Sequence, residues 1–76
     1  MNRTVREDAV KLFLSAIRVR LNEASRIATA AEACAIAGSV AEGVTVSMEI
    51  EQLIYEAGRL QDAASLLNRL TRDERS

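Results

Sequence analysis

The chain has 76 residues, of which 49% are hydrophobic and 28% are charged, and its formal net charge is −1. A chain of this length makes one domain and buries only about 60% of the surface that its unfolded form exposes. We therefore expect a single domain over residues 1–76 that needs a disulfide, a metal or oligomerisation for its stability. Because there is one cysteine and no histidine, an intrachain disulfide is excluded and a zinc site is disfavoured. Oligomerisation is the addition that the composition favours.

The hydropathy pattern favours a cytoplasmic location. Charged side chains interrupt residues 3–8, so no secretory signal is recognisable at the start of the sequence. The longest weakly polar stretch, residues 27–41, contains Glu32 and is shorter than the roughly 20 apolar residues of a membrane span. We expect no contact with a membrane.

The first predicted element is a long helix over about residues 4–42. Thirteen alanines and the absence of proline favour helix throughout. Thr4 and Glu7 fit a capping box at its start, and Gly43 supplies its C-terminal stop. A bend near residues 22–25, with Ser25 capping a separate helix, is the alternative. One seam of apolar residues at alternating steps of four and three runs along the helix: Val10, Leu14, Ile17, Leu21, Ala24, Ala28, Ala31 and Ala35.

A linker over residues 43–46 and a last helix over about residues 47–71 follow. The alternation of apolar and polar residues over positions 44–51 indicates an extended segment that leads into the helix. Ser47 is the expected N-cap, and residues 72–76 should fray. The expected seam of this helix consists of Ile50, Leu53, Ala57, Leu60, Ala64 and Leu67.

Residues 55–63 resemble the turn and second-helix start of a tetratricopeptide repeat. Gly58 and Ala63 stand at the spacing of that repeat's glycine and small alanine. The resemblance implies that the last helix breaks at Gly58. The expected fold is therefore all-α, either a long antiparallel helical hairpin or a three-helix bundle.

The first helix has more apolar surface than one neighbouring helix covers. Its polar arc is about 100° wide, whereas a helix with one partner needs an apolar stripe of only about that width. If the chain reverses near residues 43–45, Val10, Leu12 and Phe13 also extend beyond the end of the last helix. We expect a second copy to cover this surface and complete a four-helix bundle. The expected oligomer interface consists of Val10, Phe13, Leu14, Ile17 and Leu21.

Few residues are candidates for chemistry, and we expect no enzymatic activity, cofactor or metal. Without histidine, the commonest general base is absent. Cys34 lies among small residues and is expected to be a buried structural thiol. Tyr55 falls outside the last helix's seam and is the candidate partner contact.

The sequence thus predicts a small, non-enzymatic interaction or regulatory protein that acts as a homodimer, with another protein as a further candidate partner. The alternative is a nucleic-acid-binding regulator. It would use Lys11 and Arg18, which lie two turns apart on one face of the first helix.

Overall fold

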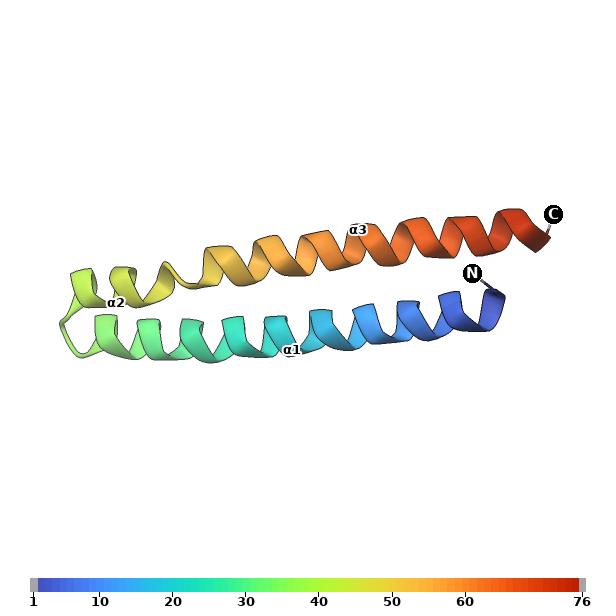
Figure 1. Cartoon of the computed structure of the whole chain (residues 1–76). Helices are drawn as coiled ribbons and strands as arrows, with labels where there is room; N and C mark the ends of the chain where they lie inside the picture. Colours follow the sequence, from blue (N-terminus) through green and yellow to red (C-terminus); the bar gives the residue numbers. More distant parts are fainter. Residues whose placement is uncertain (1, 76) are drawn as a thin grey trace.

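The chain folds into a long, thin helical hairpin. The computed structural model describes residues 2–75, with side chains up to residue 73. Helix α1 (Arg3–Ile36) forms the first arm, and α2 (Val40–Ser47) and α3 (Ile50–Arg75) follow each other along the second arm. The arms run side by side in opposite directions, so both termini lie at one end (Figure 1). The extents are 58 × 15 × 14 Å. The all-α prediction is confirmed for the described residues, which form no strand. The three-helix bundle is wrong, because it required a bend near residues 22–25 and α1 runs unbroken through them (Figure 1).

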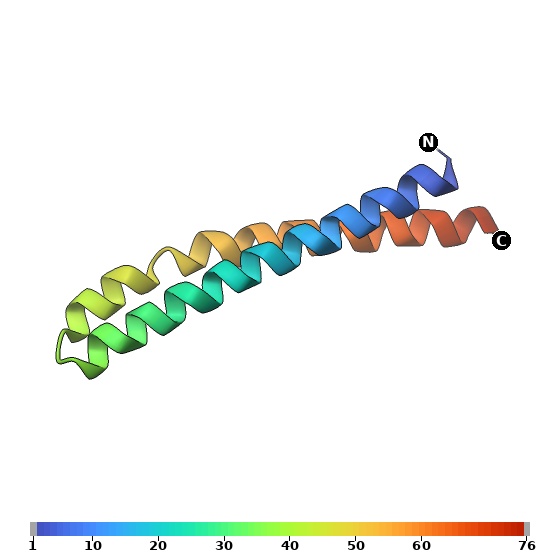
Figure 2. The same ribbon diagram turned by 90° about the horizontal axis from the view of Figure 1, so that it is seen from below.

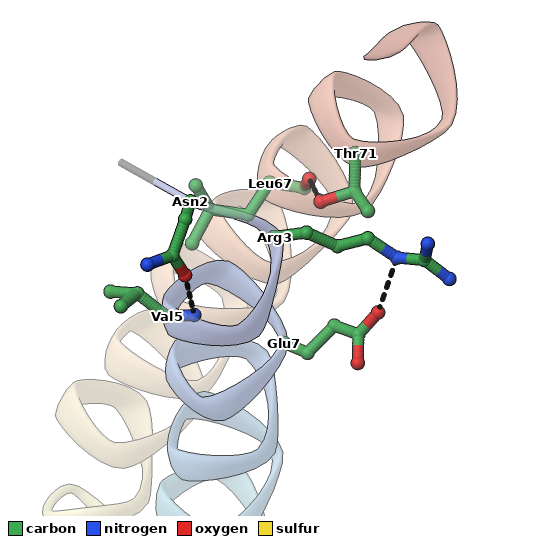
Figure 3. A network of polar contacts seen from close by, with 6 residues as sticks. All are labelled: Asn2, Arg3, Val5, Glu7, Leu67 and Thr71. Atoms are coloured by element: carbon green, nitrogen blue, oxygen red, sulfur yellow. Dashed lines mark hydrogen bonds and ion pairs between the residues drawn. The ribbon is translucent and has the colours of Figure 1, made fainter. Parts of the chain in front are cut away.

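Helix α1 begins two residues earlier than the expected capping box. Asn2 has extended backbone angles, and its Oδ1 accepts a hydrogen bond from the Val5 N–H at 2.9 Å (Figure 3). Thr4 is therefore inside the first turn. The Arg3 Nε donates to the Glu7 carboxylate at 3.1 Å, so Glu7 pairs with Arg3 and does not cap the helix. Asparagine is among the best N-cap residues, so the helix still begins with a side-chain cap, at Asn2 instead of Thr4. The helix then continues unbroken through residues 22–25.

The chain reverses at Gly38, five residues before the predicted stop at Gly43. Gly38 has a backbone φ of +99°, which residues with a side chain rarely adopt. Its N–H donates to the Ala35 carbonyl at 3.0 Å, and the Ser39 N–H donates to the Cys34 carbonyl at 2.9 Å. These two bonds make up the Schellman motif, which satisfies the last carbonyls of a helix.

The predicted linker over residues 43–46 is wrong, because these residues are helical and belong to α2. Gly43 is buried, and a Cβ built on it would lie 2.6 Å from the Ala31 carbonyl oxygen. The glycine therefore permits close approach of two backbones and does not end a helix. The extended segment predicted from the alternation over residues 44–51 is also wrong, because these residues are helical except at Met48 and Glu49, which form a turn between α2 and α3.

Helix α3 passes through Gly58 without a break and continues to Arg75. The break that the repeat resemblance implies is thus absent. The expected fraying from residue 72 also differs from the structure, in which residues 72–75 are helical. Near this end the hydroxyl of buried Thr71 donates to the Leu67 carbonyl at 3.0 Å (Figure 3).

Small residues at seven-residue spacing form the contact between the arms. The buried residues are Ala24, Ala31, Gly43, Ala57, Ala64 and Thr71. Half-buried Ile50 lies seven residues from both Gly43 and Ala57, so the repeat keeps its phase across the α2–α3 turn. A repeat of seven is the spacing at which helices pack lengthwise while crossing at a shallow angle, and Figure 2 shows the arms crossing. The predicted α3 seam is confirmed, since its six members are all buried or half-buried.

Two contacts fix how the arms align. Gly43 lies against Ala31, and Arg20 bonds to Glu56 at 3.0 Å. Because the turn comes earlier than predicted, α3 reaches back past Phe13 to Val10, which lines a hollow with Thr71. The predicted overhang of the first helix is therefore wrong, and it no longer supports a dimer.

Candidate functional site

An ion pair crosses the middle of the hairpin. Arg20 occupies a position that helical spacing assigns to the seam, seven residues after Phe13. Its Nε donates to the Glu56 carboxylate at 3.0 Å, and its Nη1 donates to the Ala16 carbonyl at 3.2 Å. Gln52 donates to the other Glu56 oxygen at 2.9 Å. The bond from Gln52 and then that from Arg20 lower the pKa of Glu56 below its ordinary value. Both charged groups are satisfied, so this pair orders the arms and offers no reactive group.

The predicted oligomer interface separates into two sets. Val10, Phe13 and Ile17 are half-buried at seam positions facing α3 within the same chain. Leu14 and Leu21 point outside the seam and are 54% and 45% exposed. These two are the members of the predicted interface that lie mostly outside the hairpin's own contact.

One side of the hairpin, which we call the Leu14 face, carries one row of residues from each arm, and these are exposed except for half-buried Ala35 and Ser47. Leu14 lines a hollow together with Gln61 and Asn68, which places these residues on the same side. Residues at seven-residue spacing continue both rows. The rows are Leu14, Leu21, Ala28 and Ala35 on α1, and Ser47, Ile54, Gln61 and Asn68 on α2 and α3. Leu21 and Ile54 lie near the Arg20–Glu56 pair, at mid-length.

The opposite side, which we call the Leu12 face, is apolar in one half and acidic in the other. Near the termini it exposes Val5, Leu12, Val19, Leu66 and Leu70. Towards the turn it has a hollow lined by Glu23, Ile27, Glu49, Gln52, Leu53 and Glu56. Leu12 itself is 69% exposed. This face was not singled out from the sequence, although Val5, Leu12 and Val19 recur at seven-residue spacing and could have indicated it.

The turn end has its own exposed apolar residues, which the sequence analysis also missed. Ile36, Val40, Val44 and Met48 are all exposed there. Tyr55, the predicted partner contact, is exposed further along α3. The Arg59 guanidinium lies 5.9 Å from the centre of its ring and bonds Asp62 at 2.7 Å. A cation over the ring occupies part of the surface on which a partner would pack.

Lys11 and Arg18, the predicted nucleic-acid contacts, are both exposed and share one row of α1. Lys11 lines a hollow with Glu7 and Arg72, which places a carboxylate among the cations. Charge differs between the ends of the hairpin. Residues 2–18 and 59–73 carry seven basic and four acidic groups, whereas residues 19–58 carry two basic and six acidic groups. The half near the termini is thus positive, and the half near the turn is negative.

The remaining features supply no chemical centre. Cys34 is half-buried, and was expected to be buried. Among the described residues no group of three or more cysteine, aspartate or glutamate side chains could hold a metal ion. Nor does any described helix have the length and apolar character required to cross a bilayer. Comparison with protein-family models, curated proteins and solved structures finds no match for this chain.

Proposed function

We propose that this protein is a small, non-enzymatic interaction protein that acts as a homodimer. One observation carries the proposal. The hairpin is only two helices thick, and no large side chain in its described part is fully buried. Thirteen large hydrophobic residues remain exposed instead, distributed over both arms.

Burial arithmetic explains why association would stabilise such a molecule. The buried positions of the seam hold only alanine, glycine and threonine, whose burial removes little apolar surface from water, and the larger side chains of the seam are half-buried. Each exposed leucine, isoleucine or valine would contribute about 1.5–3 kcal/mol if it were fully buried. A face of 58 by 15 Å is also close to the roughly 800 Å² that each partner buries in a standard protein interface. Pairing of two hairpins therefore supplies the core that one hairpin lacks.

The test is the molar mass in solution, measured by light scattering over a concentration series together with helicity by circular dichroism. We expect a helical dimer that dissociates, and loses helix, only on dilution. A chain that stays helical and monomeric at every concentration would refute the proposal.

A nucleic-acid-binding role is the alternative, supported by the positive half near the termini and by the exposure of Lys11 and Arg18. It requires binding that weakens steeply as salt rises. A gel-shift titration with mixed DNA and RNA at low salt tests it, with Lys11→Glu plus Arg18→Glu as the variant. Absence of a retained complex excludes this role and leaves the homodimer proposal intact.

A further inference from the structure

We propose that two copies pair through the Leu14 face in opposite directions. The two-fold axis lies between the copies and crosses the hairpin at the height of Leu21 and Ile54. This inference rests on the proposed homodimer and adds its surface, its orientation and its register. The occupant of the Leu14 face is thus a second copy of the same chain.

Large residues match small ones along α1 in this arrangement. An antiparallel two-fold at Leu21 places this leucine beside Leu21 of the second copy. Seven residues towards the N-terminus, about 10 Å along the helix, Leu14 comes beside Ala28 of the second copy. Exchange of the two copies repeats this contact, as a two-fold interface requires. Leucine against alanine lets the helices remain close without overpacking.

The other arm of the hairpin gives the same centre independently. Arg20 bonds to Glu56, so Leu21 and Ile54 stand at nearly the same height in the hairpin. A two-fold at Leu21 therefore also brings Ile54 beside Ile54 of the second copy. Gln61 then meets Ser47, two polar residues that can form a hydrogen bond. Both rows are self-complementary about one axis.

The distribution of charge also favours the antiparallel pair over a parallel one. In a parallel pair, the two positive halves would lie side by side and so would the two negative halves. The antiparallel pair sets each positive half along a negative one, at the 8–10 Å separation of packed helices. The clearest case is Lys11, which comes beside Glu32 of the second copy, both exposed on the row next to Leu14.

The Leu12 face does not offer the self-complementary packing and charge that the Leu14 face offers. Its apolar residues are confined to the half near the termini, and Glu23, Glu49 and Glu56 occupy the other half. Antiparallel pairing would bury Leu12 and Leu66 against carboxylates, whereas parallel pairing would bring positive ends together. Burial of an uncompensated charge is costly, so this face does not pair with itself.

Disulfide trapping tests the surface. In a Cys34→Ser background, the Leu21→Cys thiol should oxidise to a covalent dimer in high yield, because the two-fold brings the pair together. Leu12→Cys is the matched control, since Leu12 is more exposed but lies on the opposite face. Its yield should remain at the level of random collision. Circular dichroism confirms that each variant keeps its helicity.

The outcomes separate the two proposals. A dimer by light scattering that is trapped by Leu21→Cys supports both. A dimer that is trapped by Leu12→Cys, or by neither variant, overturns the inference and keeps the homodimer. A monomer at all concentrations overturns both.

A charge exchange tests the orientation. Lys11→Glu should weaken dimerisation by at least about threefold, because two symmetric pairs, each of modest strength, are lost. Lys11→Glu combined with Glu32→Lys should recover the affinity, as measured by sedimentation at low salt. If the double variant did not recover the affinity that the single variant loses, the antiparallel register would be overturned.

Discussion

Gly43 gives the sharpest test of how closely the arms approach. A methyl group at this position would lie 2.6 Å from the Ala31 carbonyl oxygen and 3.4 Å from the Ala35 nitrogen. These are backbone atoms of α1, so neither can turn aside, and α2 must move away. Such overpacking costs about 1–3 kcal/mol. Alanine also improves the intrinsic stability of a helix by about 0.5–1 kcal/mol relative to glycine. We therefore expect Gly43→Ala to lower the free energy of unfolding by up to about 2.5 kcal/mol, the overpacking cost less the gain in helix stability.

Gly58→Ala is the matched control, because Gly58 is also helical but a Cβ there has nothing within 4 Å. It should raise the free energy of unfolding by about 0.5–1 kcal/mol. Thermal unfolding followed by circular dichroism measures both, at about 4–8 °C in Tm per kcal/mol for a domain of this size. The protein concentration must be fixed, because association makes Tm concentration-dependent. If both variants gained stability equally, the close packing of α1 against α2 would be refuted.

Three further substitutions test other parts of the hairpin. Gly38→Ala should destabilise the chain by about 1–2 kcal/mol in urea denaturation, because φ is +99° there; a change of a few tenths would contradict the turn geometry. Ala64→Leu, at a site only 6% exposed, should cost about 1–3 kcal/mol, whereas Ala33→Leu on the exposed surface should stay within about 0.5 kcal/mol. The pKa of Glu56 is lowered in the folded state, so its contribution is present above about pH 4.3, the ordinary glutamate pKa, and is lost as the pH falls through the lowered value. Glu56→Gln should make stability less dependent on pH in this acid range, and an unchanged slope would argue against the bonds from Gln52 and Arg20 that lower this pKa.

The whole seam of α3 could be predicted from the sequence, but only half of the seam of α1 could. On α3 the alternation of alanine with leucine or isoleucine marks one face clearly. On α1 the periodicity identifies Val10, Ile17, Ala24 and Ala31 correctly, but then selects Leu14 and Leu21 over Phe13 and Arg20. A rule based on hydrophobicity alone assigns leucine to the seam in preference to arginine. Arg20 occupies the seam because Glu56 on the other arm satisfies its charge, and that partner is known only once the arms are aligned.

Two glycines have different roles, and a correct prediction of the turn requires that they be told apart. Gly38 is followed by Ser39 and, three residues later, by Glu42, which is a sequence typical of one helix ending and the next beginning. That local signal was sufficient to place the reversal. Gly43 has a tertiary role, because its missing side chain matters only where Ala31 comes against it. The exposed faces were harder to predict, since the apolar residues of α1 exceed what α3 covers and periodicity alone does not decide which of them stay outside.

The location of both termini at one end has a mechanical consequence (Figure 1). A pulling force applied between the two ends of this chain acts across the hairpin and not along it. The layers of the seam then separate one after another, from Thr71 towards Gly43, so only one small contact resists the force at any moment. Force applied between the turn and either terminus instead loads a helix along its axis. The same molecule should therefore open at low force when held by its two ends and resist more strongly when held by one end and its turn.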